Sequence, residues 1–226
     1  MQQAQLSLYA GEVHALLGEN GAGKSTLVKV MTGVLQKDAG EMLLDSTAQS
    51  FDSPKDAQKA GISTVYQEVN LLPNLSVAHN LFLGSEPKRF GLIDKKAMAA
   101  QARQLLSTFG LDINVTAPLS EFSVAVQQLV AIARGIAPKR GAACTKVLVL
   151  DEPTASLDAD EVQVLFQVLR QLKQQGVAIV FITHFLDQVY QISDRITVMR
   201  NGCFVGEYQT AHLNTVSYTH LRAHET

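Results

Sequence analysis

Tryptophan is absent from this chain of 226 residues, cysteine occurs only twice, and long uncharged runs are missing. Cys144 and Cys203 provide neither a metal-binding spacing nor a disulfide framework, which fits a reducing compartment. No stretch approaches the ~18 uncharged apolar residues of a membrane-spanning helix. Residues 1–10 also lack the pattern of a signal peptide. Any membrane partner would therefore be met from the aqueous side.

A surplus of positive charge is missing too, because 19 Lys and Arg stand against 21 Asp and Glu, for a formal net charge of −2. Nucleic-acid-binding surfaces and polybasic membrane anchors both require clustered cations. The composition therefore gives no support to nucleic acid as a partner. The length allows one well-buried domain and leaves no room for a second core of equal size.

Short apolar runs alternate with amphipathic segments, a pattern that predicts an α/β fold with helices packed on a mostly parallel sheet. We expect strands at residues 12–17, 41–44, 62–66, 147–150, 177–183 and 196–200. Helices are expected at residues 24–34, 95–109, 127–136 and 160–174. Pro138 should end the third of these helices, because proline cannot continue one.

Residues 18–25 match the pattern G-x-x-x-x-G-K-[ST] between an expected strand and an expected helix. Glycines in such a loop let backbone N–H groups turn inward around a phosphate at the helix N-terminus. The pattern predicts that Lys24 reaches the β- and γ-phosphates and that the Ser25 hydroxyl binds Mg²⁺. The expected phosphate-binding residues are Gly18, Asn20, Gly21, Gly23, Lys24, Ser25 and Thr26. The alternative is a glycine-rich turn without a ligand.

Two carboxylates, Asp151 and Glu152, follow the apolar run at residues 147–150. A buried strand that ends in this way places Asp151 at the carboxyl edge of the sheet, beside the phosphate loop. We expect Asp151 to hold Mg²⁺ and Glu152 to orient or deprotonate an attacking water. The second carboxylate favours an enzyme over a protein that only binds phosphate.

At this point the sequence resembles the ATP-binding-cassette family. The run Asp-Glu-Pro-Thr-Ala-Ser-Leu-Asp at residues 151–158 is similar to the family's block after the buried strand. Thr183-His184 resembles its histidine loop, and Gln67 resembles its glutamine loop. The resemblance extends from about residue 6 to about residue 210.

The resemblance implies ATP and Mg²⁺ as cofactors and two domains that clamp face to face around ATP. It implies that Lys24, Glu152, Gln67 and His184 are catalytic, and that Ser25, Asp151 and Gln67 bind the metal. Ser123 would reach the ATP of the partner domain, and Asp158 would link the two sites. It also implies a helical lobe at about residues 76–136 and an antiparallel β edge near the N-terminus. His14 and His79 have no such context and are expected to be structural or surface residues.

The signature segment departs from the family pattern Leu-Ser-Gly-Gly-Gln. Here the segment reads Phe-Ser-Val-Ala-Val at residues 122–126. Ala125 replaces a glycine and restricts close backbone approach, while Val126 offers no polar group. We expect the ATP site that this segment completes on its partner to be weakened.

Segments around the phosphate loop, Gln67 and residues 70–78 resemble the ATPases of bacterial ribose and galactose importers. Residues 86–91, 122–128 and 183–191 look most similar to those of galactofuranose importers. This resemblance implies a second cassette in tandem, membrane permease subunits and, indirectly, a periplasmic sugar-binding protein. It implies a peripheral location on the cytoplasmic face of the bacterial inner membrane.

We expect residues 1–215 to form one nucleotide-binding domain that lacks its usual opening strands. Residues 216–226 have no helical or strand period and resemble translated adapter DNA, so we expect a non-native tail. Two alternatives stay open. One is a non-transport ATP-binding-cassette protein that acts on ribosomes or DNA, and the other is an inactive fragment.

Overall fold

The computed structural model describes residues 4–66, 71–138 and 141–212. Its central sheet consists of β1 (Val13–Leu17), β4 (Ile62–Val65), β7 (Val147–Asp151), β8 (Ala178–Ile182), β9 (Arg195–Arg200) and β10 (Cys203–Gln209). The strand order is β10-β9-β1-β8-β7-β4, and every neighbouring pair is parallel except β10 and β9. This confirms the predicted α/β fold with a mostly parallel sheet.

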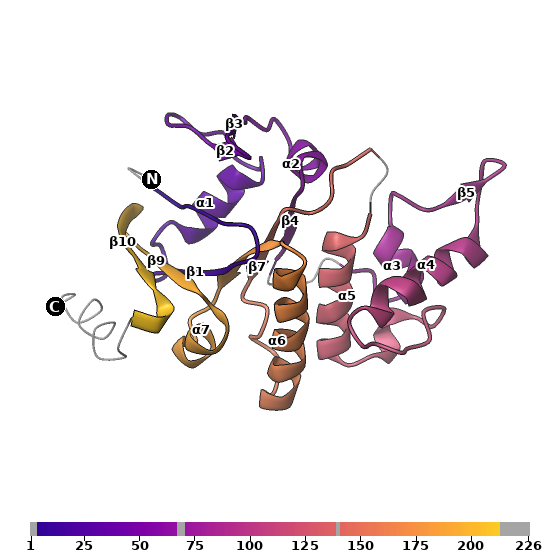
Figure 1. The fold of residues 1–226 in the computed structure, drawn as a ribbon. Coiled ribbons are helices and arrows are strands. Elements are labelled where there is room, and N and C mark those ends of the chain that lie inside the picture. Colours follow the sequence, from indigo (N-terminus) through magenta and orange to yellow (C-terminus); the bar gives the residue numbers. More distant parts are fainter. Residues whose placement is uncertain (1–3, 67–70, 139–140, 213–226) are drawn as a thin grey trace.

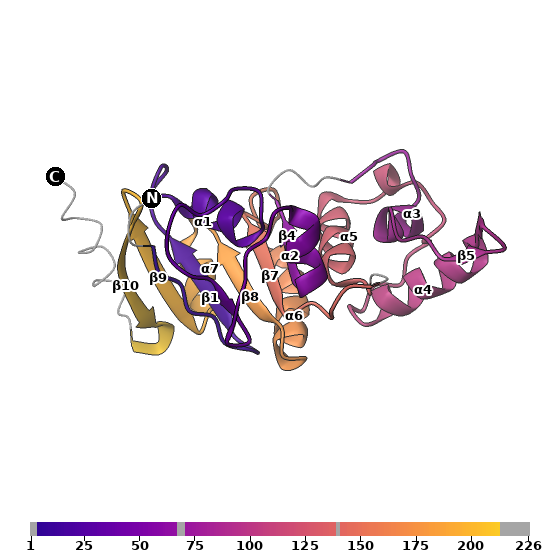
Figure 2. The same cartoon turned by 90° about the horizontal axis from the view of Figure 1, so that it is seen from above.

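The α-helices are α1 (Lys24–Met31), α2 (Pro54–Ala60), α3 (Val77–Phe82), α4 (Lys95–Ser107), α5 (Val124–Ile136), α6 (Ala159–Gln174) and α7 (Leu186–Ile192). Helices α1 and α2 cover one face of the sheet, and α6 and α7 cover the other (Figure 1). Helices α3 and α4 extend beyond α5 at one end of the molecule (Figure 2). Two short hairpins complete the chain, β2 (Leu43–Leu44) with β3 (Thr47–Ala48) and β5 (Lys88–Arg89) with β6 (Leu92–Ile93). Within the described part of the chain, no helix is both long and apolar enough to cross a membrane.

Strand β7 shows why a parallel strand is apolar on both sides. Val147 and Val149 belong to the hydrophobic cluster under α1 and α2, which includes Val28. Leu148 and Leu150 point the other way, into the cluster that contains the buried side chains of α5 and α6. Alternate side chains of a strand face opposite sides of the sheet, so both halves of the run are buried and no polar residue is tolerated until Asp151.

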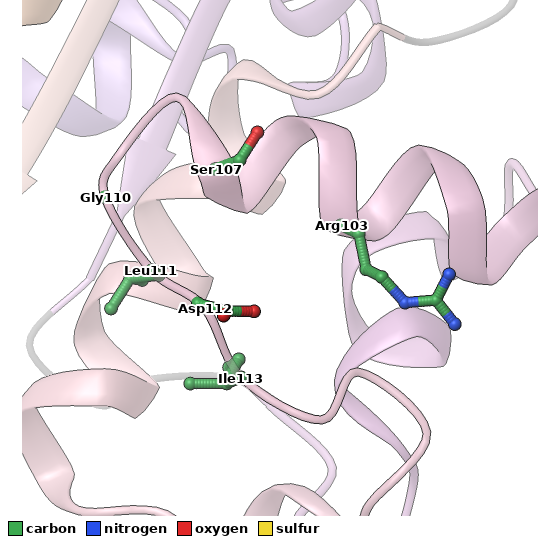
Figure 3. Close-up of a pocket in the computed structure, with 6 residues that line it drawn as sticks. All are labelled: Arg103, Ser107, Gly110, Leu111, Asp112 and Ile113. Carbon is green, nitrogen blue, oxygen red and sulfur yellow. The ribbon is translucent and has the colours of Figure 1, made fainter.

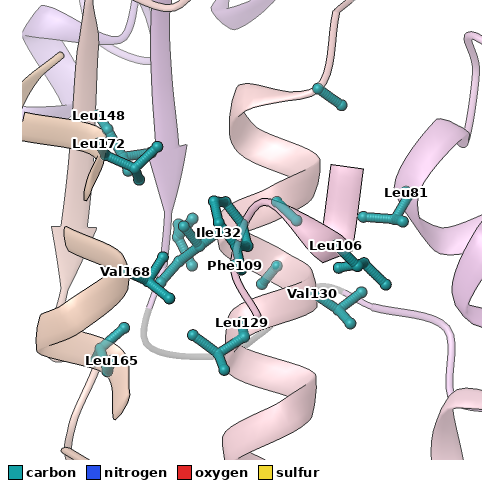
Figure 4. Packing of buried hydrophobic residues seen from close by; sticks show 14 of the residues in the cluster. Leu81, Leu106, Phe109, Leu129, Val130, Ile132, Leu148, Leu165, Val168 and Leu172 are labelled. Atoms are coloured by element: carbon teal, nitrogen blue, oxygen red, sulfur yellow. The ribbon is translucent and has the colours of Figure 1, made fainter. Parts of the chain in front are cut away.

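Helix α5 joins the sheet to the outer helices. Its side chains pack towards Leu165 and Val168 of α6 on one side and towards Leu106 and Leu81 on the other (Figure 4). The helix ends at Ile136. Ala137 leaves the helical conformation with a ψ of 134°, because the residue before a proline is restricted away from the helical region. The sheet and the outer helices therefore share one continuous core.

Several elements differ from expectation. Helix α5 begins at Val124 rather than at residue 127, because the Ser123 hydroxyl caps it. Helix α1 ends at Met31 rather than at residue 34, just before Gly33 takes a positive φ of 70°. The antiparallel edge of the large sheet is β10, not a strand near the N-terminus, and the antiparallel pair there is the separate β2–β3 hairpin. Helices α2, α3 and α7 were not predicted because they are only six or seven residues long, and β10 was not predicted because it is a partly exposed edge strand.

Candidate functional site

The carboxyl ends of β1, β8 and β7 meet at one edge of the sheet. The register pairs Leu16 of β1 with Ile182 of β8, and Ile182 in turn with Asp151 of β7. The loops that follow these strands start side by side at this level. In open α/β sheets, ligands bind outside the carboxyl ends of the strands, so this edge is the candidate site.

The loop after β1 can only be built with glycine at its first position. Gly18 has a φ of 154°, and a Cβ atom there would lie 2.4 Å from the carbonyl oxygen of Met199. Gly23 has a φ of 97° and is the residue that precedes α1. The two glycines therefore let the chain turn tightly from the end of β1 into the helix.

Helix α1 differs from most other helices in having no side-chain cap at its N-terminus. Side chains cap the N-termini of α2 to α6: Ser53, Ser76, Asp94, Ser123 and Asp158 respectively. The first N–H groups of a helix have no partner within it and carry partial positive charge. At α1 these belong to Lys24, Ser25 and Thr26, so this end of the helix can bind an anion.

The Lys24 side chain folds back over the loop. Its Nζ donates to the carbonyl oxygen of Gly18 at 2.6 Å and to that of Glu19 at 3.1 Å. Burial lowers the pKa of Lys24, while the charges of Glu152 and Asp151 act in the opposite direction. Lys24 is therefore a partly desolvated cation, close enough to the two carboxylates to feel their charge.

Asp151 and Glu152 form a site of concentrated negative charge. Burial raises the pKa of Asp151, the neighbouring Glu152 raises it further, and Lys24 opposes both. A bound cation would relieve this cost. Among the described residues, no group of three His, Cys, Asp or Glu side chains is arranged to hold a metal. Mg²⁺ commonly takes only one or two carboxylates, with water and phosphates as further ligands, so Asp151 with the exposed Ser25 hydroxyl fits it.

Glu152 and His184 are in direct contact. His184 Nδ1 lies 2.9 Å from Glu152 Oε2, and since an ionised carboxylate can only accept, Nδ1 is the donor. Glu152 adopts a φ of 50°, and its N–H donates to the carbonyl oxygen of Ile182 at 2.9 Å. The His184 ring also lies against Phe185, with centroids 3.9 Å apart. The structure thus brings together two residues that the sequence analysis singled out separately.

Other predicted site residues have local structural roles in this conformation. The Ser123 hydroxyl accepts from the N–H of Val126 at 3.4 Å. Asp158 accepts from the N–H of Glu161 at 2.8 Å in a capping box at the start of α6. Asn20 is exposed in the phosphate loop. Gln67 and the tail at residues 216–226 lie outside the described residues.

His14 and His79, which were expected to be structural or surface residues, both have hydrogen-bonded partners. Buried His14 contacts Thr197 Oγ1 through Nε2 at 2.7 Å, and His79 contacts the Ser76 hydroxyl through Nδ1 at 2.7 Å. Both contacts lie within the scaffold, which fits a structural role.

A separate depression lies on the outer helices, at the end of α4. Arg103, Ser107, Gly110, Leu111, Asp112 and Ile113 line it (Figure 3). The side chains of Arg103 and Ser107 extend away from each other rather than converging on a common point (Figure 3). Arg103 and Ser107 therefore do not converge on one ligand.

One set of hydrogen-bonding contacts at the main site was not predicted from the sequence. Thr154, just after Glu152, and Thr183, just before His184, both contact Gln188 of α7. A polar residue on a short, unpredicted helix carries no motif, so only the spatial arrangement reveals this link.

Comparison with known proteins agrees with these motifs. A family model described as "ABC transporter" matches residues 1–155. The galactofuranose transporter ATP-binding protein YtfR of Escherichia coli (strain K12) is 56% identical over 213 residues, covering 94% of this chain and 42% of that protein. The fructose import ATP-binding protein FruK of Bifidobacterium longum is 52% identical over 206 residues, covering 91% of this chain and 39% of that protein. This chain thus spans about two fifths of the length of these relatives.

A solved structure supports the same assignment. The ADP conformation of MJ1267, an ATP-binding cassette of an ABC transporter, superposes with a TM-score of 0.76 at 27% identity, covering 90% of this chain and 82% of that one. The fold that carries the phosphate loop and the two carboxylates is therefore one already known from such cassettes. On the family match and on these identities, the chain belongs to the ABC transporter family.

Proposed function

We propose that this chain binds MgATP at its phosphate loop and hydrolyses it to ADP and phosphate, as an ATPase unit of a bacterial monosaccharide importer. The observation that best supports the proposal is the α1 N-terminus, which has no side-chain cap. It stands beside a cation, Lys24, that feels the charge of two carboxylates. A triphosphate with its metal would satisfy all of these groups at once.

The binding step uses charge and backbone. The N–H groups at the start of α1 and the loop around Gly21 would surround the phosphates. Lys24 would exchange its two carbonyl contacts for the β- and γ-phosphates, and Thr26 would lie on the α-phosphate side. Mg²⁺, held by Ser25, Asp151 and Gln67, would neutralise charge on the phosphate oxygens.

The hydrolysis step uses the pair Glu152 and His184. Glu152 would accept a proton from the attacking water as oxygen bonds to the γ-phosphorus and the bond to the ADP oxygen breaks. The Nδ1–Oε2 contact leaves the second ring nitrogen of His184 available to the nucleotide or the water. Lys24 would stabilise the negative charge on the transferred phosphoryl group.

The import role rests on the relatives, whose names assign them to galactofuranose transport and fructose import. We infer that this chain works with a second cassette in tandem on a longer polypeptide and with membrane permease subunits. A periplasmic sugar-binding protein would act through these, and the location would be peripheral, on the cytoplasmic face of the inner membrane. Helices α3 to α5 would form the helical lobe, at about residues 76–136.

The two nucleotide sites of such an assembly would be unequal. Ser123 and Asp158 would act across the interface, Ser123 on the partner's ATP and Asp158 between the sites. Ala125, on the first turn of α5, would allow a less close backbone approach to the partner's ATP than glycine would, and Val126 would offer it no polar group. The site on this chain's own phosphate loop, completed by the partner, would carry most of the hydrolysis. An unchanged rate after mutation of the partner's signature motif would rule out this asymmetry.

The test is ATP binding and hydrolysis by the complete transporter in vesicles, followed together with sugar uptake. We expect uptake that depends on ATP and stops in Glu152→Gln. ATP hydrolysis that never depends on permease or sugar would instead favour a non-transport ATPase. A chain that binds no nucleotide would favour the inactive-fragment alternative.

A further inference from the structure

The contact between Glu152 and His184 joins the loop after β7 to the loop after β8. The His184 side chain is 64% exposed and that of Glu152 is 17% exposed. Because the histidine is so open to water, the attraction between the two side chains contributes little to holding them together. The pairing of β7 with β8 and the hydrogen bond from the Glu152 N–H to the carbonyl oxygen of Ile182 fix where the two loops begin. Further support for the loops comes from the groups beneath them.

Beneath them lies a buried hydrogen-bonded group. The Thr154 hydroxyl donates to Gln188 Oε1 at 2.6 Å. The Thr183 hydroxyl lies 3.5 Å from the same oxygen, a long contact. Thr154 and Thr183 are each 2% exposed, whereas Gln188 is half-buried, so these contacts lie at the border of the interior. One amide oxygen therefore connects the loop after β7 to the loop after β8.

The helix that carries Gln188 is itself fixed. Val189, the next residue, is fully buried in a cluster with Ala15 and Leu17 of β1 and with Ile196 of β9. The N–H of Phe185 donates to the Thr183 hydroxyl at 3.2 Å, which ties the start of α7 to the end of β8. Through α7, Gln188 thus links both loops to β1, the strand that precedes the phosphate loop.

We propose that Gln188 is a positioning residue that sets the Glu152–His184 contact through Thr154 and Thr183. The inference rests on the proposed ATPase function for its kinetic consequence, but not for its structural one. Removing the amide would leave the hydroxyl of Thr154, a residue only 2% exposed, without its acceptor, which costs free energy. The loop would then relax, and Glu152 and His184 would move relative to each other.

Four variants separate this role from general stability. Gln188→Met keeps the length of the side chain and removes the acceptor, whereas Gln188→Glu keeps an oxygen acceptor. Thr154→Val removes the donor at equal volume. Gln191→Met makes the same chemical change on α7 at an exposed position, where the amide oxygen only accepts from Gln163 at 3.0 Å.

The first measurement is ¹⁵N NMR of the histidine-labelled 226-residue chain, with the His184 signals assigned from a His184→Ala variant. The Nδ1 resonance reports the hydrogen bond to Glu152. We expect it to shift in Gln188→Met and Thr154→Val and to keep its wild-type position in Gln188→Glu and Gln191→Met. An unshifted resonance in Gln188→Met overturns the inference, whether or not the protein hydrolyses ATP.

The second measurement is ATP turnover by the complete transporter. We expect Gln188→Met to lower kcat by about 10- to 100-fold, the cost of a small misplacement of reacting groups, with KM changed less than about twofold. Gln188→Glu should recover most of that loss. In a His184→Ala background Gln188→Met should cost little more, because residues that act as a unit are not additive. A full additional loss there contradicts the inference, while a wild-type transporter without any ATP turnover contradicts the proposed function instead.

Discussion

His184 Nδ1 donates a hydrogen bond of 2.9 Å to Glu152 Oε2, across a sequence separation of 32 residues. The contact exists because β7 and β8 are adjacent and parallel, with Asp151 level with Ile182. Each strand therefore delivers its following loop to the same edge of the sheet. A carboxylate and an imidazole in contact are groups suited to handling the proton of an attacking water, as the proposed function requires.

Lys24→Ala should weaken ATP binding by about 10- to 100-fold, since a hydrogen bond to a charged group contributes about 1.5–3 kcal/mol. The reason is that Lys24 is the cation within the phosphate loop and already lies against the carbonyl oxygens of Gly18 and Glu19. Isothermal titration calorimetry with MgATP measures the effect. Lys29→Ala, at an exposed position of the same helix, is the matched control and should bind like wild type. Equal affinity in Lys24→Ala would place the nucleotide elsewhere.

Glu152→Gln should keep ATP binding and lower hydrolysis by about 10²–10⁴-fold, the usual contribution of a general base. The amide retains the size of the side chain and can still accept from His184, so the geometry survives while the proton acceptor is lost. Phosphate release by the complete transporter is the measurement, with Asp160→Asn on the exposed start of α6 as control. Wild-type turnover in Glu152→Gln would remove this residue from the mechanism.

Asp151→Asn should stabilise the nucleotide-free chain at neutral pH. Burial first, and then the charge of Glu152, raise the pKa of Asp151 in the folded state. The folded chain therefore binds this proton more tightly than the unfolded chain. The contribution of Asp151 to stability is greatest below the ordinary carboxyl pKa of about 3.9 and is lost as pH rises through the raised pKa.

Thermal unfolding from pH 3.5 to 7.5 tests this linkage. The melting temperatures of wild type and Asp151→Asn should diverge as pH rises, with the variant higher at pH 7. With ATP present, added Mg²⁺ should stabilise the wild type and have little effect on the variant. A variant that melts below wild type at pH 7 would show that the charge attraction between Lys24 and Asp151 outweighs the cost of burial.

Asp158→Ala should destabilise the chain by about 1 kcal/mol, the usual cost of losing an N-terminal cap. Asp158 and Glu161 satisfy each other's backbone N–H groups at the start of α6, at 2.8 and 3.1 Å. Urea unfolding of the isolated chain measures the loss. Asp158→Asn keeps an acceptor and should lose much less. If ATP turnover in the transporter falls in Asp158→Asn while stability does not, the residue also acts across the interface, as we propose.

Much of the site was predictable because its residues stand directly after strongly apolar runs. The run at residues 147–150 predicted a strand buried on both faces, and β7 occupies Val147–Asp151. The glycine spacing around Lys24 predicted a tight turn into a helix, and only a residue without a Cβ fits at Gly18. Short helices such as α7 gave no comparable signal, since seven residues hold too few turns to show a period.

The sequence by itself determined which residues are chemically equipped to act: the phosphate loop, the lysine, the two carboxylates and the histidine. Local rules are enough for this, because turn geometry and strand burial depend on neighbouring residues. Only the tertiary structure decided which of them touch. Strand order set β8 between β1 and β7, and that order brings His184 to Glu152 and places Gln188 beneath both loops. Contacts between residues far apart in sequence depend on how strands are ordered and registered, which no local pattern encodes.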